Sequence, residues 1–156
     1  MKKQYWLMKS EPSEFSIDDL AKRKEEFWDG VRNYQVRNMF RDEFTIGDKA
    51  LFYHSSTKEI GVVGEMEVSK ETMVDKTQFD ENNKHYDSKS TKNNPRWLGS
   101  TVKFVSKFNR TVTLEELKAN SIFSDLALVK KGNRLSVMPI SKKHYDAIVK
   151  LGNKKV

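Results

Sequence analysis

The sequence predicts an α+β fold in which a curved, barrel-like mixed β-sheet is flanked by short helices. Short apolar stretches typical of strands alternate with short capped helical stretches, and no regular βαβ period joins them. A length of 156 residues fits a single domain over 1–156. Nine Phe, five Tyr and three Trp supply bulky material for a core, although only 37% of the residues are hydrophobic.

The first elements are a strand and a capped helix. Residues 5–8 form an apolar run typical of a buried strand, which the Pro12 turn ends. Ser16 is expected to cap a helix through Lys24, with Asp19 at the reciprocal position of a capping box. The inward face of this helix would consist of Ile17, Leu20 and Ala21.

A turn, a helix and two strands are expected next. The turn covers 28–30, and the helix covers 33–42 with one apolar face. That face contains Val36, Met39 and Phe40. The runs 50–54 and 61–68 have the composition of strands. Glycines within or beside the second strand indicate a β-bulge or a close backbone approach at Gly61 and Gly64.

The segment 75–96 lacks hydrophobic periodicity and is rich in Asp, Asn, Lys and Ser. Unstructured loops of this length are uncommon in compact domains, so we expect a functional or mobile loop here. A strand over 97–108 follows it and places Val102 and Phe104 on one face.

The C-terminal elements are a helix, a strand and a second helix. A capping box at 113–116 opens the first helix, and 134–137 reads as a strand closed by Pro139. Ser141 caps the final helix. The apolar face of that helix would contain Tyr145, Ile148 and Val149.

The sequence offers little for catalysis. It contains no cysteine, and its three histidines lack metal-ligand spacing. No glycine-rich phosphate loop and no G-x-S-x-G motif is found. His54 and Ser55 are neighbours on an expected strand, so their side chains point to opposite faces and form a poor dyad. We therefore expect no catalytic residues, no metal and no cofactor.

The basic charge is concentrated in two segments. The chain carries a net charge of +7, and 84–110 contains seven basic residues against one acid. The segment 129–156 contains eight against one. Such segregation fits an electrostatic footprint for nucleic-acid phosphates. The alternative is that dispersed surface lysines keep the protein soluble.

Location and assembly are also expectations. The N-terminus has a basic start but no apolar run of signal-peptide length, and no stretch approaches the roughly 20 apolar residues of a membrane span. We expect a cytoplasmic monomer without a membrane partner, or a nuclear one in a host with a nucleus.

The segment 28–38 (WDGVRNYQVRN) is aromatic, basic and polar at once. Arg32 and Asn33 stand at the expected helix start, where free backbone N–H groups favour anions. The arginines could neutralise phosphates and Asn33 could read a base edge. The alternative is an ordinary amphipathic helix with solvated arginines. Trp28 and Trp97 flank polar turns, so each could stack on a base or simply pack in the core.

Six sequence motifs resemble those of the EVE domain family, in the same order and over nearly the whole chain. They are YWLMKSEPSEFS (5–16), WDGVRNYQVRN (28–38), GDKALFYHS (47–55), TQFD (77–80), NPRW (94–97) and RLSV (134–137). The resemblance implies a PUA-like fold, related to the YTH domains that hold a methylated adenine in an aromatic cage. It also implies binding of RNA or DNA through recognition of a methylated or hydroxymethylated base.

The resemblance also implies site residues. The base-binding set is Lys9, Ser10, Trp28, Arg32, Asn33, Tyr53, His54, Ser55, Trp97, Leu135 and Ser136, and the phosphate-binding set is Arg37, Lys92, Arg96 and Arg134. Three departures from the family pattern stand out: Val36 in place of alanine, Met138 in place of glutamine, and the run 98–101. If Met138 and that run line the pocket, the ligand would differ from that of the relatives.

Two other functions stay open. One is a nucleobase-binding or interaction module that makes no contact with a nucleic-acid backbone. The other is an enzyme acting on nucleic acid, with Asp29, His54 and Glu11 as its candidate residues. The sequence leaves the choice between DNA and RNA, and the identity of the base, undecided.

Overall fold

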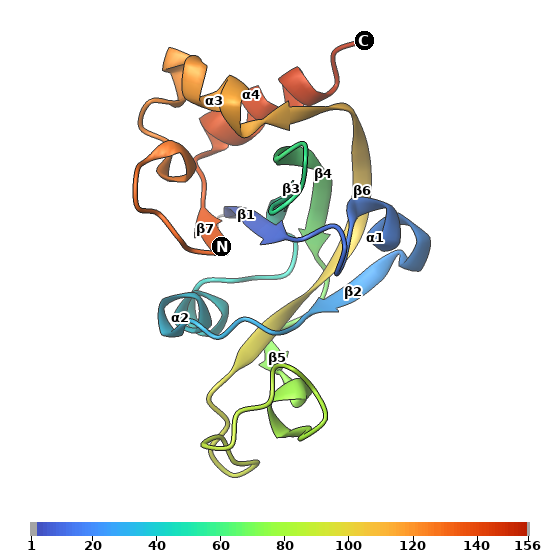
Figure 1. Cartoon of the computed structure of the whole chain (residues 1–156), viewed down its shortest axis with the longest axis vertical. Coiled ribbons are helices and arrows are strands. Elements are labelled where there is room, and N and C mark those ends of the chain that lie inside the picture. Colours follow the sequence, from blue (N-terminus) through green and yellow to red (C-terminus); the bar gives the residue numbers. More distant parts are fainter. Residues whose placement is uncertain (1–2, 156) are drawn as a thin grey trace.

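The computed structural model describes residues 3–155 and confirms the α+β class. A curled sheet has the strand order β2-β6-β4-β3-β1-β7, and β5 pairs with β6 (Figure 1). The strands are β1 (Tyr5–Ser10), β2 (Glu25–Trp28), β3 (Lys49–His54), β4 (Gly61–Val68), β5 (Met73–Val74), β6 (Leu98–Thr113) and β7 (Val137–Pro139). The helices are α1 (Ile17–Arg23), α2 (Tyr34–Asp42), α3 (Leu114–Ala119) and α4 (Lys142–Gly152), with short 3₁₀ turns η1 (Lys76–Phe79), η2 (Ser121–Phe123) and η3 (Ala127–Val129).

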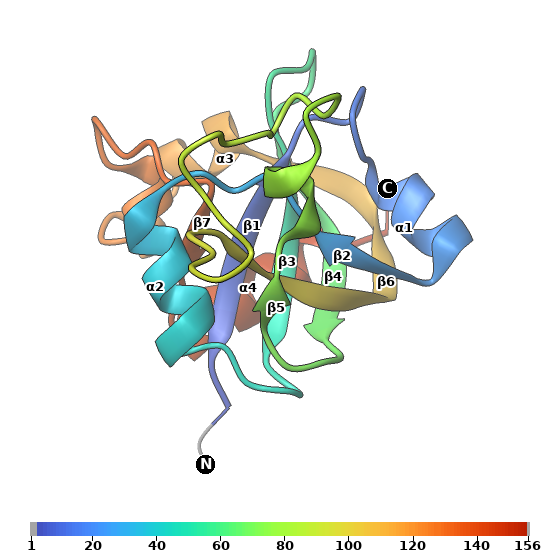
Figure 2. The same cartoon turned by 90° about the horizontal axis from the view of Figure 1, so that it is seen from below.

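The sheet is mixed because one of its strand pairs is parallel. β1 runs parallel to β3, with Lys9 opposite Tyr53, whereas the other pairings are antiparallel. β6 spans 16 residues and pairs with β2, β4 and β5, so it runs most of the length of the molecule (Figure 1). The view from below in Figure 2 shows these three strands close to β6.

The β-bulge or close backbone approach predicted at Gly61 and Gly64 of β4 is confirmed. The β4–β6 register shifts between Val62 and Gly64. A Cβ on Gly61 would lie 2.3 Å from the carbonyl oxygen of Val112, and one on Gly64 would lie 2.4 Å from that of Ser106. Only glycine permits such backbone approaches, which let the sheet curl.

The two faces of the sheet bury separate cores. Because side chains alternate along a strand, Trp6 and Met8 of β1 enter one core and Leu7 enters the other. The first core is covered by α1 and α2, and the second by α3 and α4 (Figure 1). None of the helices within residues 3–155 is long and apolar enough to cross a membrane.

The predicted helix starts are confirmed in their details. Ser16 and Asp19 form a complete capping box, and Ser141 caps α4 through its side chain. Asn33 lies at the start of α2 as expected, and its side chain also caps that helix, a role that was not predicted. Thr113 accepts a hydrogen bond from the N–H of Glu116, which is half of the predicted box. The other half is missing because the Glu116 carboxylate is engaged by Arg110 at 2.7 Å.

Three element boundaries differ from the sequence prediction. β2 was not predicted, because EEFW has mixed polarity and starts directly after Lys24, a left-handed residue with φ 72°. The strand predicted over 134–137 begins only at Val137 and includes Pro139, which an edge strand tolerates. The strand predicted over 97–108 extends to Thr113.

Candidate nucleic-acid interface

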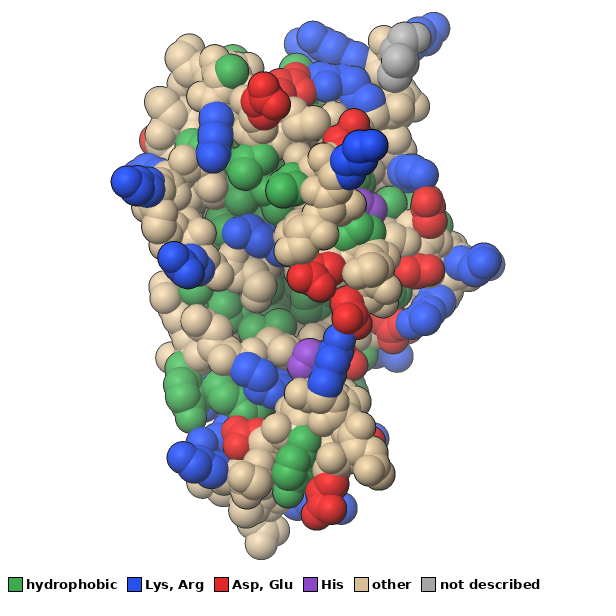
Figure 3. Space-filling model, viewed as in Figure 1, with side chains coloured by type: hydrophobic (Ala, Val, Ile, Leu, Met, Phe, Trp, Pro, Cys, Tyr) green, Lys and Arg blue, Asp and Glu red, His purple; other side chains and the backbone are tan. Residues whose placement is uncertain are grey.

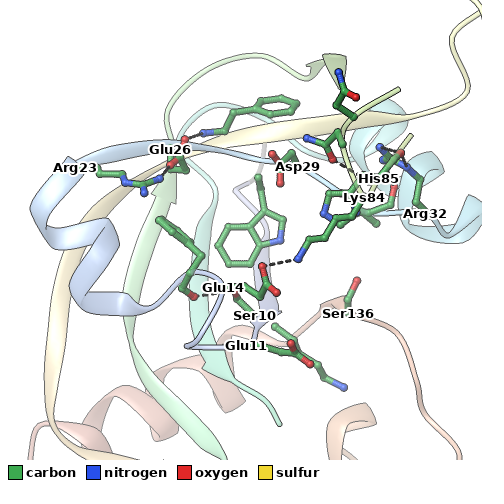
Figure 4. Close-up of a pocket in the computed structure, with 18 residues that line it drawn as sticks. Ser10, Glu11, Glu14, Arg23, Glu26, Asp29, Arg32, Lys84, His85 and Ser136 are labelled. Atoms are coloured by element: carbon green, nitrogen blue, oxygen red, sulfur yellow. Dashed lines mark hydrogen bonds and ion pairs between the residues drawn. The ribbon is translucent and has the colours of Figure 1, made fainter. Parts of the chain in front are cut away.

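A first cavity of about 850 Å³ opens beside the end of β1. It is bounded by the turn after β1, by β2 with the connection to α2, by residues 82–85 of the long loop, and by Ser136 (Figure 4). Asp29 and His85 lie on one side of the opening, and Glu11 and Ser136 lie on the other. Figure 3 shows this face hollowed, with hydrophobic side chains in the floor and charges of both signs around it.

Trp28 is the aromatic wall of the first cavity. Its ring contacts Phe52 at a centroid distance of 5.3 Å and Phe15 at 6.1 Å, both edge-on, so its orientation is fixed by packing. No residue within 3–155 accepts a hydrogen bond from its Nε1, whereas Nε1 of Trp6 donates to Asp48 and Nε1 of Trp97 donates to Asp87. The Trp28 N–H is not fully buried, since Ser100 Oγ is the only fully buried side-chain N or O atom without a partner among residues 3–155. The N–H is therefore open to the cavity, where it can donate to a ligand.

Carboxyl groups also line the first cavity, although the chain as a whole is basic. Glu14 pairs with Lys84 at 2.5 Å, and Glu26 pairs with Arg23. Asp29 has no such cation among the described residues. Burial of its carboxyl raises its pKa, and the nearby charge of Asp75 raises it further. Asp29 can therefore accept hydrogen bonds as a carboxylate or donate one when it is protonated.

Arg32 lines the first cavity, but its guanidinium holds the loop in place. Its five N–H donors go to the carbonyl oxygens of Val31 and His85, to Asp75 at 3.0 Å and to Thr77 at 2.9 Å. Burial alone would raise the pKa of Asp75, yet hydrogen bonds from Thr77, from the Gly30 N–H and from Arg32 hold that pKa below its ordinary value. With its donors occupied, Arg32 shapes the cavity wall and is not free to bind a base or a phosphate.

The base-binding residues predicted from the motifs separate into three groups. Lys9, Ser10, Trp28, Arg32 and Ser136 meet at the first cavity. Tyr53 lines a second cavity together with Lys9. The residues Asn33, His54, Ser55, Trp97 and Leu135 line neither cavity.

The residues outside the cavities have structural partners that explain their positions. Asn33 accepts from the Val36 N–H as the cap of α2. His54 Nε2 accepts from the Ile17 N–H at 3.1 Å, and burial lowers the pKa of His54. Trp97 is 5% exposed and packs on Tyr34. Of the two roles considered for Trp97, stacking on a base and packing in the core, its environment therefore fits packing in the core.

The predicted phosphate-binding residues lie outside both cavities. Arg37 donates to the carbonyl oxygen of Arg96, and the Arg96 guanidinium is 3.9 Å from Asp87. Lys92 and Arg134 are exposed on loops. The positions at which the chain departs from the family pattern do not line the first cavity either. Met138 is 1% exposed and belongs to the second core, and residues 98–101 pair with β2 and β5.

The second cavity, of about 730 Å³, adjoins the first. It is lined by Lys9, Tyr53, Leu114, Lys118, Ser124, Leu128, Val129, Lys130, Lys131, Gly132 and Asn133. The sequence did not predict this cavity, and it indicated the acids Glu11 and Asp29 of the first cavity only as candidates for the enzyme alternative. The available signals were the adjacent Lys130 and Lys131 in the basic C-terminal segment, and Glu11 and Glu14 in the motif of residues 5–16. No group of three His, Asp or Glu within 3–155 is arranged to hold a metal ion.

Comparisons with known proteins identify the family. The EVE domain model matches residues 4–151. Thymocyte nuclear protein 1 of Gallus gallus is 38% identical, over 97% of this chain and 69% of that protein. The crystal structure of human THYN1 protein in complex with 5-methylcytosine containing DNA is 38% identical and has a TM-score of 0.90, covering 99% of this chain and 100% of that chain. The chain belongs to the EVE domain family, as its motifs predicted.

The PUA-like fold implied by the resemblance is confirmed as well. The YTH domain of Zygosaccharomyces rouxii MRB1 protein, solved in complex with N6-methyladenosine RNA, has a TM-score of 0.56 and covers 99% of this chain and 89% of that one. Its sequence identity of 16% means that the likeness concerns the fold alone.

Proposed function

We propose that this protein binds nucleic acid and inspects a modified base in the first cavity. The observation that carries the proposal is the indole of Trp28, which is fixed by Phe15 and Phe52 and keeps its N–H donor free at the cavity. The human relative, 38% identical to this chain, was crystallised with 5-methylcytosine containing DNA, which supports the same class of ligand here.

The cavity chemistry suits a flipped-out cytosine or adenine. Carboxylates accept hydrogen bonds from exocyclic amino groups, as Glu and Asp do from cytosine N4. Asp29 lines the cavity, and we propose this role for its carboxyl group. The Trp28 N–H can donate to a base carbonyl or ring nitrogen. Extrusion of a base costs a few kcal/mol, which these contacts must offset.

Discrimination of the modification requires more than the added methyl group. A buried methyl contributes about 0.8 kcal/mol, which corresponds to only about a fourfold preference. A larger preference needs polar groups that lose a partner when the wrong base enters. Ser10, Asp29 and Ser136 are the cavity residues able to act in this way, and we propose a binding role for them and no catalytic step.

A titration with oligonucleotides tests the proposal. Single- and double-stranded DNA and RNA would each carry one modified cytosine or adenine beside an unmodified control, at two salt concentrations. Tighter binding to one modified member that weakens as salt rises is expected. Binding of a free nucleobase that gains nothing from attached phosphates would favour the nucleobase module instead.

A pair of matched variants assigns the cavity. Trp28→Phe keeps an aromatic ring in the core but removes the indole N–H, and Trp97→Phe does the same at a tryptophan that is equally buried but outside the cavities. We expect Trp28→Phe to lose roughly tenfold in affinity for the modified oligonucleotide, the value of about one hydrogen bond, and Trp97→Phe to retain it. The opposite ranking would refute the assigned cavity.

A further inference from the structure

We propose that the second cavity binds the phosphodiester groups next to the inspected base, through Lys9, Lys118, Lys130 and Lys131. This inference rests on the proposed function, because it describes where the strand goes once its base has entered the first cavity. It assigns the two tasks of recognition to two neighbouring cavities, the base to the first and the backbone to the second.

The charge of the second cavity supports this assignment. Its 11 lining residues include these four lysines and no acid. None of the four forms an ion pair with any carboxylate within residues 3–155. In the first cavity, by contrast, Arg23, Arg32 and Lys84 are paired with Glu26, Asp75 and Glu14. Of the lysines and arginines that line either cavity, those without an ion pair therefore all line the second one.

Lys9 connects the two cavities because its side chain lines both. Its ammonium lies 5.7 Å from the centroid of the Tyr53 ring, and burial lowers its pKa. A partly desolvated ammonium without a carboxylate is costly, and a phosphate beside it would relieve that cost. A strand whose base enters the first cavity thus meets Lys9 on its way to the second.

The remaining lysines are held by ordered elements. Lys118 belongs to α3, and the turn that carries Lys130 and Lys131 is tied back to Ala127 by the N–H of Lys130 and by the amide of Asn133 at 3.0 Å. Gly132 follows with φ 86° and open space around its Cβ position, so this turn is accessible to a ligand. Lysine binds phosphate as a point charge, and cations spread over three segments suit successive phosphates better than one small anion.

The test compares two double variants that remove the same charge. Lys130→Gln/Lys131→Gln changes the second cavity, and Lys143→Gln/Lys150→Gln changes two exposed residues of α4 that line neither cavity. Affinity for a modified single-stranded oligonucleotide and for its unmodified control is measured as a function of salt, with circular dichroism to verify folding.

We expect the cavity variant to lower the salt slope by about 1.4, since each single-strand phosphate contact contributes about 0.7. If the variant and the wild type bind equally at 1 M salt, this difference in slope corresponds to roughly 25-fold weaker binding of the variant at about 0.1 M salt. Both oligonucleotides should lose affinity by the same factor, because backbone contacts carry no base information. The α4 variant should change the slope by much less.

The possible results separate the two proposals. Equal effects of the two double variants, or an unchanged slope in the cavity variant, would overturn the phosphate site while a preference for the modified base still stood. If the wild type binds the modified and unmodified oligonucleotides equally, while the cavity variant still lowers the salt slope, only the proposed recognition of a modified base would be overturned. NMR titrations of the Lys130 and Lys131 amide resonances provide a further check. Saturable chemical-shift changes with sodium phosphate but none with the oligonucleotide would overturn the inference in favour of a free anion.

Discussion

The ion pair between Arg32 and Asp75 is the main contact that holds the long loop against the rest of the first cavity. The variant Arg32→Ala tests how much this contact contributes to the free energy of unfolding. The Asp75 side chain is fully buried and that of Arg32 is 22% exposed. Breaking a buried pair leaves an uncompensated charge and costs about 3–5 kcal/mol. Because Arg32 is partly solvated, we expect about 3 kcal/mol, a large part of the 5–15 kcal/mol typical of a domain.

Urea unfolding measures this free energy, and hydrogen exchange locates it. Loss of Arg32 also frees the His85 carbonyl and Thr77, so amides over 75–90 should exchange faster than those of β3 and β4. Arg32→Lys keeps the charge but not the five-donor fork, and should recover only part of the loss. A destabilisation below 1 kcal/mol with unchanged exchange would refute the structural role of Arg32.

The same pair predicts a pH dependence. The pKa of Asp75 is lower in the folded protein than its ordinary value. The stability that it contributes is therefore fully present above the unfolded pKa of about 3.9 and is lost as the pH falls through the folded pKa. The difference in unfolding free energy between wild type and Asp75→Asn should shrink as the pH falls below about 4. A difference that stays constant over that range would contradict the lowered pKa.

Three further outcomes follow from other sites. Asp48→Ala should cost about 3 kcal/mol in urea unfolding, because its buried carboxylate accepts four hydrogen bonds that water cannot replace. Gly61→Ala should destabilise by at least 2 kcal/mol through its backbone clash, whereas Gly132→Ala, in open space at positive φ, should cost about 1 kcal/mol. Asp29→Asn should raise the melting temperature at pH 7, because the raised pKa of Asp29 means that its ionised form destabilises the folded protein. The increase in melting temperature should vanish below the unfolded pKa of about 3.9, where Asp29 is protonated in both states. The same variant should weaken binding of the modified oligonucleotide, and stronger binding would contradict the role of Asp29.

Local signals made much of the fold predictable. The caps at Ser16 and Ser141 depend on neighbours three residues away, so the sequence alone reveals them. The close backbone approaches at Gly61 and Gly64 of β4 were also predictable, since glycine inside a strand signals such an approach. β2 carried no such signal, because its residues gain their place only by pairing with β6.

The site was harder to predict because its parts are distant in sequence. Arg32 reaches the His85 carbonyl across 53 positions, and this contact decides that its donors are occupied. The motifs grouped Ser10, Trp28 and Ser136, and these three residues line one cavity. The motifs could not show that Trp28 lines the cavity and Trp97 does not. Trp97 donates to Asp87 and packs on Tyr34, and these contacts depend on how the long loop folds.

The most direct measurement of the central claim follows the three indole N–H resonances by NMR while an oligonucleotide with a single 5-methylcytosine is added. Trp6 and Trp97 already donate to carboxylates, and Trp28 does not. Binding of the base in the first cavity predicts a large shift of the Trp28 resonance, a smaller one with the unmodified control, and little change at Trp6 and Trp97. Saturable binding of the modified oligonucleotide that leaves the Trp28 resonance in place would contradict the claim.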